Sequence, residues 1–408
     1  MGTTMAMWAR SLLAVSVTLV AAACGSVPAG SGAGATSTPA ASTTPTPATT
    51  SRASAANLAH ASLLSTSWIN ANDGWALAAQ PCANGSCIRV AHTTDAGQDW
   101  QVLPDPPARI QDSTVDCSAQ MCVSEVSFVS PGVGYLYGPA LLMTTDGGVT
   151  WHAQAGPQTE TLAIVSGQVY RVVYSHGGCP GPCQPSLQAA QAGSANWRTL
   201  IARLAGPDRS DSAQIAASGP DVLVAMYGSL AGPVPAQAMV YRSADGGGTW
   251  RQVADPCRGL GQGGPTQEED LIGLTAAAGG FFAGICAPHA ITSTFVVTSG
   301  DAGATWRATT APPPGHLLGI LAAASPTTIA IASSALGGSG TDTAQLLVTT
   351  DGGRRWVTAA TDTQNLVNGS VPAALGFETP NVGQWVGDPH GVWTTTDGGL
   401  HWTRTAFR

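Results

Sequence analysis

Short apolar and β-branched segments alternate with glycine-containing turns from residue 58 to residue 408. The first four segments span Leu63–Asn70, Gly74–Gln80, Ile88–Thr94 and Asp99–Leu103. Each has the length of a β-strand and is bounded by turn residues. Gly (50) and Pro (28) together make up about a fifth of the 408 residues, which favours many turns over long helices. The pattern therefore predicts an all-β domain.

One eight-residue pattern, Ser/Thr-x-Asp-x-Gly-x-x-Trp, recurs six times in this region. Its Asp and Trp residues are Asp95 and Trp100, Asp146 and Trp151, Asp245 and Trp250, Asp301 and Trp306, Asp351 and Trp356, and Asp397 and Trp402. Successive Asp residues are 46 to 56 positions apart, except for one step of 99 that equals two periods. A seventh copy is expected near residue 195, where Trp197 keeps the Trp position but the Asp and the aligned Gly are lost.

Seven repeats of about 50 residues, each built from short strands, are typical of a β-propeller with four-stranded blades. We therefore predict a seven-bladed β-propeller with four-stranded antiparallel blades over residues 58–408. In the last blade, one strand is expected to end near Phe377, and the others to span Val382–Gly387, Gly391–Thr395 and His401–Ala406. Each blade is complete within the chain, so the ring is expected to close between the first and seventh blades. Whether a terminal strand crosses between them stays open.

The repeated pattern lies between the third and fourth strands of each blade, and we expect its role to be structural. The Asp carboxylate can accept backbone N–H groups of the turn that follows. The Gly can adopt a positive φ, and the Trp can bury its ring on the turn or on the next blade. The alternative is a calcium loop, because Asp95-x-Gly97-x-Asp99 offers two carboxylates. Only this copy has the second acid, so we predict no metal and no cofactor.

The pattern resembles the Asp-box, or bacterial neuraminidase repeat, over residues 58–408. Asp-box propellers include sialidases, xyloglucan-cleaving glycosidases, sortilin-like receptors and the photosystem II assembly/stability factor family. The seven repeats and the run Phe128-Val129-Ser130-Pro131, followed by Gly134-Tyr135, look most like the last of these families. The resemblance implies a fold and does not specify an activity.

The N-terminal segment is expected to be a lipoprotein signal peptide, residues 1–23. Its apolar run from Ser11 to Ala23 is shorter than the roughly 20 residues of a spanning helix and follows a single charge, Arg10. The run leads to Cys24 through small residues and resembles a bacterial lipobox, although Ala21 stands where that motif usually has Leu. Cys24 is therefore the expected lipidation site. The alternative is ordinary cleavage that leaves Cys24 as a free thiol.

Residues 24–57 are expected to form a disordered linker. They consist almost entirely of Ala, Gly, Ser, Thr and Pro, with Arg52 as the single charge, and such a segment cannot bury a core. Two acyl chains on Cys24 would give a stable membrane anchor. We therefore predict an exported protein that is lipid-anchored to the cell membrane on its extracytoplasmic side.

Eight further cysteines remain, an even number in a chain expected to be exported. The simplest pairing is Cys82–Cys87, Cys117–Cys122, Cys179–Cys183 and Cys257–Cys286. Partial pairing and free thiols stay open, as does a metal site formed by His176 with the third pair. In a four-stranded blade these cysteines fall in turns between second and third strands or in inter-blade links. All eight are thus expected on the face opposite the Asp-boxes.

The same face is expected to carry the longest insertions, Gly178–Leu187, Gly228–Gln237 and Leu336–Gln345. Long loops on a rigid scaffold are common sites of function. We therefore predict that a protein or glycan partner binds to this face.

The charge pattern excludes several kinds of chemistry. All sixteen basic residues are Arg, so a Schiff-base lysine and a P-loop lysine are excluded. The net charge of -8 argues against a nucleic-acid partner. Charged residues make up only 10%, as expected where stacked blades leave charge to loops and rims.

Catalysis has little support in the sequence. A sialidase requires an arginine triad, a Tyr/Glu pair and an Asp acid, and the chain has no Arg-Ile-Pro motif. Arg198, Arg251 and Arg307 each follow a repeat Trp and are not expected to converge. The five Glu residues are Glu125, Glu160, Glu268, Glu269 and Glu378. Two carboxylates can cleave glycosides, but the sequence does not give their spacing. We predict a non-catalytic binding or scaffold protein, with a sialidase-like glycoside hydrolase as the alternative.

Overall fold

The structure of the protein is a computed structural model. It describes residues 58–408 except for 59, 84, 112–116, 118–120, 175–183, 206–209, 229–237, 261–268, 289–293, 311, 313–315, 336–342 and 364–373. The described residues form strands and turns without a helix, so none of them belongs to a helix able to cross a membrane.

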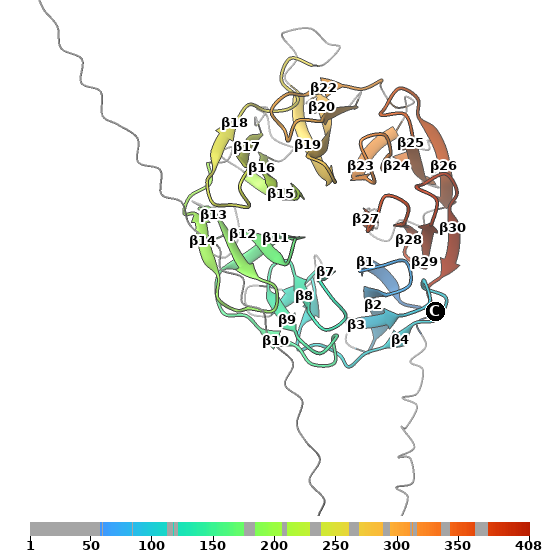
Figure 1. Ribbon diagram of the computed structural model, residues 1–408. Helices are drawn as coiled ribbons and strands as arrows, with labels where there is room; N and C mark the ends of the chain where they lie inside the picture. Colours follow the sequence, from blue (N-terminus) through green and yellow to red (C-terminus); the bar gives the residue numbers. More distant parts are fainter. Residues whose placement is uncertain are drawn as a thin grey trace, which may run out of the picture. The chain divides into compact units, whose positions relative to one another are not determined.

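Seven four-stranded antiparallel sheets are arranged as the blades of a ring (Figure 1). Blade 1 contains β1 (Ser62–Trp68), β2 (Gly74–Cys82), β3 (Gly85–Thr93) and β4 (Gln101–Val102). Blade 2 contains β7 (Glu125–Phe128), β8 (Gly134–Tyr137), β9 (Leu141–Thr144) and β10 (His152–Ala153). Blade 3 contains β11 (Gln158–Val165), β12 (Gln168–Tyr174), β13 (Pro185–Gln191) and β14 (Arg198–Ile201). Blade 4 contains β15 (Ser210–Ser218), β16 (Asp221–Gly228), β17 (Met239–Ser243) and β18 (Arg251–Val253).

The remaining three blades follow the same order. Blade 5 contains β19 (Glu269–Ala277), β20 (Phe281–Pro288), β21 (Phe295–Ser299) and β22 (Arg307–Ala308). Blade 6 contains β23 (His316–Ala323), β24 (Ile329–Ala335), β25 (Thr343–Thr349) and β26 (Val357–Thr363). Blade 7 contains β27 (Ala374–Phe377), β28 (Gly383–Asp388), β29 (Gly391–Thr395) and β30 (Thr403–Ala406). A parallel pair, β5 (Arg109–Ile110) and β6 (Cys122–Val123), lies in the link between blades 1 and 2. In every blade the first strand lies nearest the centre of the ring (Figure 1).

The predicted fold is confirmed, including the blade without a complete repeat. Blade 3 has all four strands, although only Trp197 of the repeat pattern remains there. Its ring supports a cation–π contact, with the Arg171 guanidinium carbon 3.9 Å from the ring centroid.

The ring closes between blades 1 and 7 without an exchanged strand, since each blade comes from one continuous stretch of chain. The Leu63 N–H donates to the carbonyl of Pro389 at 2.8 Å. Phe407 packs edge-on against Trp100, with ring centroids 5.3 Å apart, in a buried cluster that includes Leu58. Hydrophobic packing, together with a hydrogen bond, therefore joins the two ends of the propeller.

The six repeat turns share one hydrogen-bond arrangement. In blade 2 the Thr144 hydroxyl donates to Asp146 at 2.8 Å and accepts the Gly148 N–H at 2.9 Å. The Thr150 N–H donates to Asp146 at 2.8 Å. Gly148 has a φ of 95°, so the expected roles of the Asp and the Gly are confirmed in this turn. The corresponding hydroxyls, which make the same two bonds, belong to Thr93, Ser243, Ser299, Thr349 and Thr395.

These hydrogen bonds favour the ionised form of the Asp. The Thr150 hydroxyl and N–H, followed by the Thr144 hydroxyl, lower the pKa of Asp146 to about 2. In the first repeat, the Asp99 N–H donates to Asp95 at 3.0 Å and is the largest cause of its lowered pKa. Asp95 thus binds its own turn. Within the described residues, no group of three or more His, Cys, Asp or Glu side chains is placed to hold a metal ion.

Some repeat Trp residues contact their own turn, as expected: the Trp250 indole N–H donates to the Gly247 carbonyl at 3.2 Å. The repeat Trp residues also join neighbouring blades, but on the preceding side rather than the expected next side. Trp151 of blade 2 lies in a buried cluster with Trp75 and Leu77 of blade 1. Trp356 of blade 6 donates its indole N–H to the carbonyl of Thr310, after blade 5, at 3.0 Å. The ring of each Trp therefore packs on the preceding blade. The fourth strand is the outer edge of its own sheet. The Trp that precedes this strand therefore lies beside the preceding blade.

Replacing Thr144 by Val is expected to lower the free energy of unfolding by about 2 kcal/mol, because it leaves the buried Gly148 N–H without an acceptor. Val has nearly the shape of Thr, so packing is retained. Thr145→Val, one residue along and exposed, is the matched control and should change stability little. Urea unfolding of both variants makes the comparison. Equal effects at the two positions would mean that the hydroxyl does not hold the turn.

Candidate functional site

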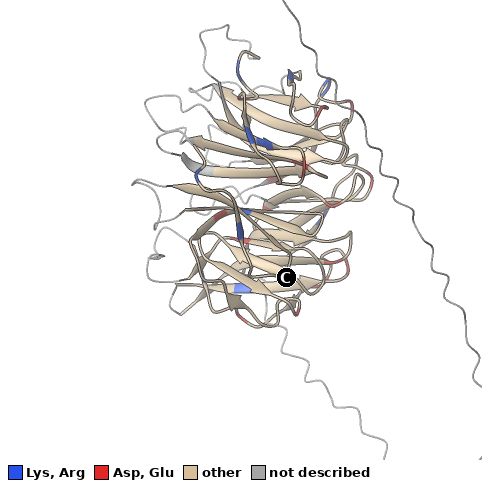
Figure 2. Ribbon diagram, turned by 60° about the vertical axis from the view of Figure 1, so that its left-hand side comes forward, with Lys and Arg blue, Asp and Glu red and all other residues tan. Residues whose placement is uncertain are grey.

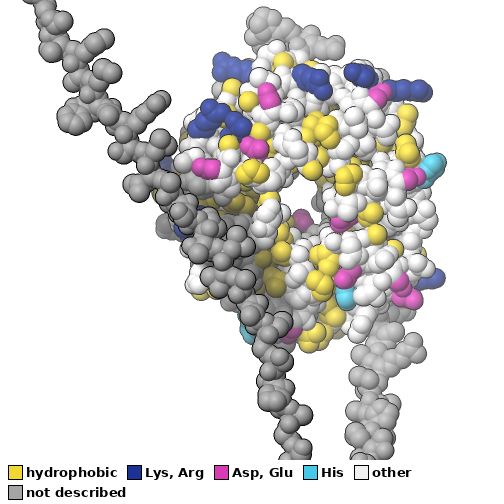
Figure 3. Space-filling model, in the orientation of Figure 1, with side chains coloured by type: hydrophobic (Ala, Val, Ile, Leu, Met, Phe, Trp, Pro, Cys, Tyr) yellow, Lys and Arg dark blue, Asp and Glu magenta, His cyan; other side chains and the backbone are white. Residues whose placement is uncertain are grey.

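A cavity of about 250 Å³ lies at the centre of the ring, between the innermost strands of blades 1, 2, 6 and 7. Figure 3 shows the hollow on the face of the ring. The cavity wall is formed by Ser65, Thr66, Ser67, Trp68, Glu125, Val126, Ser127, Tyr137, Ile320, Ala374, Leu375, Gly376, Glu378 and Gln384. Hydroxyl, amide and carboxyl groups thus share the wall with a few apolar side chains.

Glu125 and Tyr137 form one side of the cavity. They are directly opposite each other on the paired strands β7 and β8. Burial raises the pKa of Glu125 to about 7, against a smaller effect of the Ser65 hydrogen bond. Burial also raises the pKa of Tyr137, and the charge of Glu125 adds to this effect. Tyr137 is therefore neutral near pH 7, and Glu125 exchanges its proton in the same pH range.

Glu378 and Gln384 form the opposite side. The Glu378 N–H donates to the carbonyl of Val382 at 3.0 Å across the turn that follows β27. Burial raises the pKa of Glu378 to about 8, although its own backbone and the neighbouring Gln384 amide favour ionisation. Two of the five Glu residues of the chain therefore meet at one cavity.

This convergence was not predicted, because Glu125 and Glu378 belong to blades 2 and 7. The sequence contains a usable signal, since each Glu lies on or directly after the first strand of its blade. First strands line the axis of a propeller. A carboxyl group in such a strand is therefore a candidate for the central cavity.

No arginine is among the described residues that line the cavity. Arg198, Arg251 and Arg307 are the first residues of β14, β18 and β22, the outermost strands of their blades, and their side chains are exposed. Arg109 lies in β5, in the link between blades 1 and 2. These arginines do not converge, in agreement with the expectation from the sequence.

Three of the four predicted disulfides are confirmed, and Cys179–Cys183 lies outside the described residues. Cys82–Cys87 closes the turn between β2 and β3. Cys117–Cys122 ties the link between blades 1 and 2 to β6, and Cys257–Cys286 ties the link after blade 4 to β20.

All three disulfides lie on one face of the ring. Successive turns of an antiparallel sheet alternate between its two ends, so turns between second and third strands lie opposite the repeat turns. Figure 2 shows acidic segments gathered in loops on one side, as expected when six repeat turns each bring an Asp to the same face. We call the face with the three disulfides the cross-linked face. The three predicted insertions lie mostly outside the described residues, as do Cys24 and the linker.

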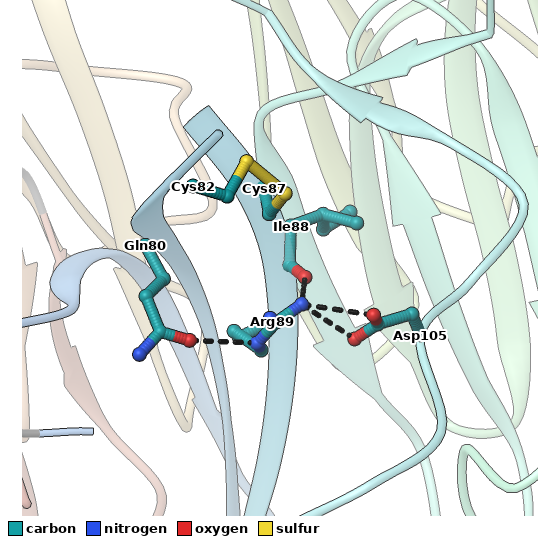
Figure 4. Close-up of a disulfide and its surroundings, with 6 residues drawn as sticks. All are labelled: Gln80, Cys82, Cys87, Ile88, Arg89 and Asp105. Carbon is teal, nitrogen blue, oxygen red and sulfur yellow. Dashed lines mark hydrogen bonds and ion pairs between the residues drawn. A yellow bond between two sulfur atoms is a disulfide. The ribbon is translucent and has the colours of Figure 1, made fainter. Parts of the chain in front are cut away.

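The Cys82–Cys87 disulfide lies beside a hydrogen-bonded ion pair (Figure 4). Arg89 donates through Nε to Gln80 Oε1 at 2.8 Å, and through Nη1 to the two carboxylate oxygens of Asp105 at 2.9 and 2.8 Å. Gln80 belongs to the same hairpin, whereas Asp105 belongs to the link that leads to blade 2. Arg89 thus fixes the hairpin to the link, and the disulfide closes its tip.

Comparison with known proteins supports the fold. No protein-family model matches the chain, and no curated protein matches its sequence. A polysaccharide lyase of family PL25, an ulvan lyase, has a TM-score of 0.51 at 11% identity, over 86% of this chain and 95% of that chain. A prolyl endopeptidase has a TM-score of 0.53 at 13% identity, over 86% of this chain and 50% of that chain.

The structure of YCF48 bound to a D1 peptide also matches, with a TM-score of 0.47 at 18% identity over 84% of this chain and 92% of that chain. The matched proteins thus include enzymes and a peptide-binding protein. At such identities the likeness concerns the fold alone, and the fold is a seven-bladed β-propeller.

Proposed function

We propose that this chain is a lipid-anchored, extracytoplasmic Asp-box propeller, of the photosystem II assembly factor-like type. In this proposal it acts as a non-catalytic binding or scaffold protein for a protein or glycan partner, which docks on the cross-linked face. The anchor rests on the lipobox-like sequence before Cys24 and on the Ala/Ser/Thr/Pro-rich linker behind it.

The observation that carries the docking proposal is the covalent fixing of one face. Three disulfides, together with the Arg89–Asp105 ion pair, hold turns and inter-blade links of this face in place. A surface whose loops are fixed before binding loses less conformational entropy when a partner docks. Met121, directly before Cys122, adds a large apolar side chain that is 39% exposed.

The alternative is a sialidase-like glycoside hydrolase. It is favoured by the neighbouring Tyr137 and Glu125, a Tyr–Glu pair at the central cavity. It is disfavoured because the described lining residues include no arginine to bind the carboxylate of a sialoside. Turnover of a fluorogenic sialoside by the purified protein would establish the alternative and exclude the non-catalytic proposal.

The docking face is tested with two matched substitutions in a cross-linking pull-down from membranes of the native host. Met121→Asp places a charge on the cross-linked face, and Val149→Asp places one on an exposed apolar residue, 51% exposed, in the repeat turn of the same blade. We expect capture of the partner to fall at least ~10-fold for Met121→Asp, equal to about 1.4 kcal/mol, and to be unchanged for Val149→Asp. The reverse result would place docking on the other face. Cys24→Ser in the same cells should release the protein from the membrane fraction.

A further inference from the structure

Unpaired polar atoms gather in the wall of the central cavity. Gln384 is only 2% exposed, yet neither Nε2 nor Oε1 of its amide has a hydrogen-bond partner. Oε2 of Glu378 also lacks one, although the two side chains are neighbours. Most buried polar groups in folded proteins are hydrogen-bonded, and an orphaned one costs about 1–3 kcal/mol. These three atoms have almost no accessible surface, so a molecule in the cavity pairs with them once the two side chains turn toward it.

The charge of the wall selects the class of that molecule. Among the described lining residues, the ionisable groups are Glu125, Glu378 and Tyr137, and none of these residues is an arginine or a histidine. A carboxylate or phosphate would lose its hydration without gaining a positive partner. Anionic ligands are therefore excluded.

Hydrogen-bond complementarity excludes a bare cation as well. A cation would satisfy Glu378 Oε2 and Gln384 Oε1, but it would leave the Gln384 Nε2 donor unpaired. A hydroxyl group donates and accepts at once, so neighbouring hydroxyls can satisfy the amide and the carboxyl together. Leu375 and Ile320 offer apolar contact for the C–H groups of the same molecule.

The volume agrees with a small ligand. A cavity of about 250 Å³ holds about eight water molecules at their liquid volume, or a single six-membered sugar ring in their place. We infer that the central cavity binds a neutral polyhydroxylated ligand of monosaccharide size, with Gln384 and Glu378 as its hydrogen-bonding groups. The inference concerns the axis of the ring and is independent of docking on the cross-linked face.

Gly376 provides a variant that fills the cavity. It lies opposite Gln384 in the pairing of β27 with β28 and lines the cavity. A Cβ at this position meets no atom within 4 Å, so the side chain of Gly376→Val takes up cavity volume without displacing the wall. The matched control is Gly300→Val, since Gly300 is an exposed glycine of a repeat turn whose added Cβ is equally free of contacts.

Gln384→Leu gives a second, independent readout. It removes the two orphaned polar atoms and keeps a side chain of similar length. A residue that only supported the fold would destabilise the protein when replaced. A ligand-binding residue left unpaired in the free protein should instead give a variant at least as stable as the wild type that no longer binds.

The experiment uses the full chain and ligand-observed NMR with glucose, galactose, mannose, N-acetylglucosamine and myo-inositol, beside glucuronate and glucosamine as charged counterparts. We expect at least one neutral compound to bind. Gly376→Val and Gln384→Leu should weaken that binding at least ~10-fold, equal to about 1.4 kcal/mol, whereas Gly300→Val should leave it unchanged. An array of immobilised glycans distinguishes a free monosaccharide from the terminal unit of a longer glycan.

Three results would overturn the inference: no binding of any neutral compound, tighter binding of glucuronate or glucosamine than of every neutral compound, or equal binding by Gly376→Val and the wild type. A cavity filled by water alone gives the first of these. None of the three affects the pull-down with Met121→Asp, so this inference and the proposed function can fail separately.

Discussion

Replacing Arg404 by Met is expected to lower the free energy of unfolding by about 3 kcal/mol, because the variant leaves a buried carboxylate without its cation. Arg404 of β30 donates through Nε to Asp362 of β26 at 3.2 Å, and through Nη2 to Asp388 at 2.5 Å. The Asp362 side chain is only 10% exposed, and it also accepts the Trp393 indole N–H at 2.7 Å. One guanidinium thus joins blade 6 to blade 7.

The measurement is a thermal unfolding scan at pH 7. A loss of about 3 kcal/mol should lower the Tm of a domain of this size by roughly 4 °C. Arg251→Met is the matched control, since Arg251 also lies on an outermost strand but makes no ion pair among the described residues. Its Tm should stay close to that of the wild type. A similar loss in both variants would show that the effect comes from replacing an arginine on an outermost strand and not from the charge that Asp362 needs.

The fold could be predicted from the sequence because its defining features are local. Each repeat turn uses residues within five positions of its Asp, and the spacing of these turns sets the number of blades. Even the blade around Trp197 was placed correctly, since a missing repeat leaves a step of two periods. Disulfides between cysteines close in sequence could be predicted for the same reason. Cys82 and Cys87, for example, flank one hairpin turn.

The cavity and the ion pair between Arg404 and Asp362 depend instead on how separate blades pack against each other. Glu125 and Glu378 meet only because the ring brings blade 7 beside blade 1 and blade 2. Arg404 finds Asp362 across a boundary between two sheets. The direction in which Trp151 packs also depends on the position of the preceding blade. A repeat period gives the number of blades, but it does not give the contacts between them.

Replacing Glu378 by Gln is expected to change how stability depends on pH. The pKa of Glu378 in the folded protein is raised from 4.5 to about 8 by burial. Between these two values the folded state keeps a proton that the unfolded chain has lost, so the free energy of unfolding falls as the pH rises. Gln imitates the protonated carboxyl at every pH. The variant should therefore match the wild type near pH 4 and exceed its stability by about 5 kcal/mol near pH 9.

Urea unfolding from pH 4 to pH 9 tests this prediction, with Glu125→Gln as the comparison. The pKa of Glu125 is raised to about 7, so its substitution should remove only the part of the fall in stability that ends near pH 7. The pH range over which stability falls ends near 7 for Glu125 and near 8 for Glu378. This difference assigns the pH dependence to the two individual carboxyls of the cavity. A wild-type profile that is flat between pH 5 and pH 8 would show that both carboxyls are hydrated in the folded protein. The orphaned Oε2 of Glu378 would then have water as its partner.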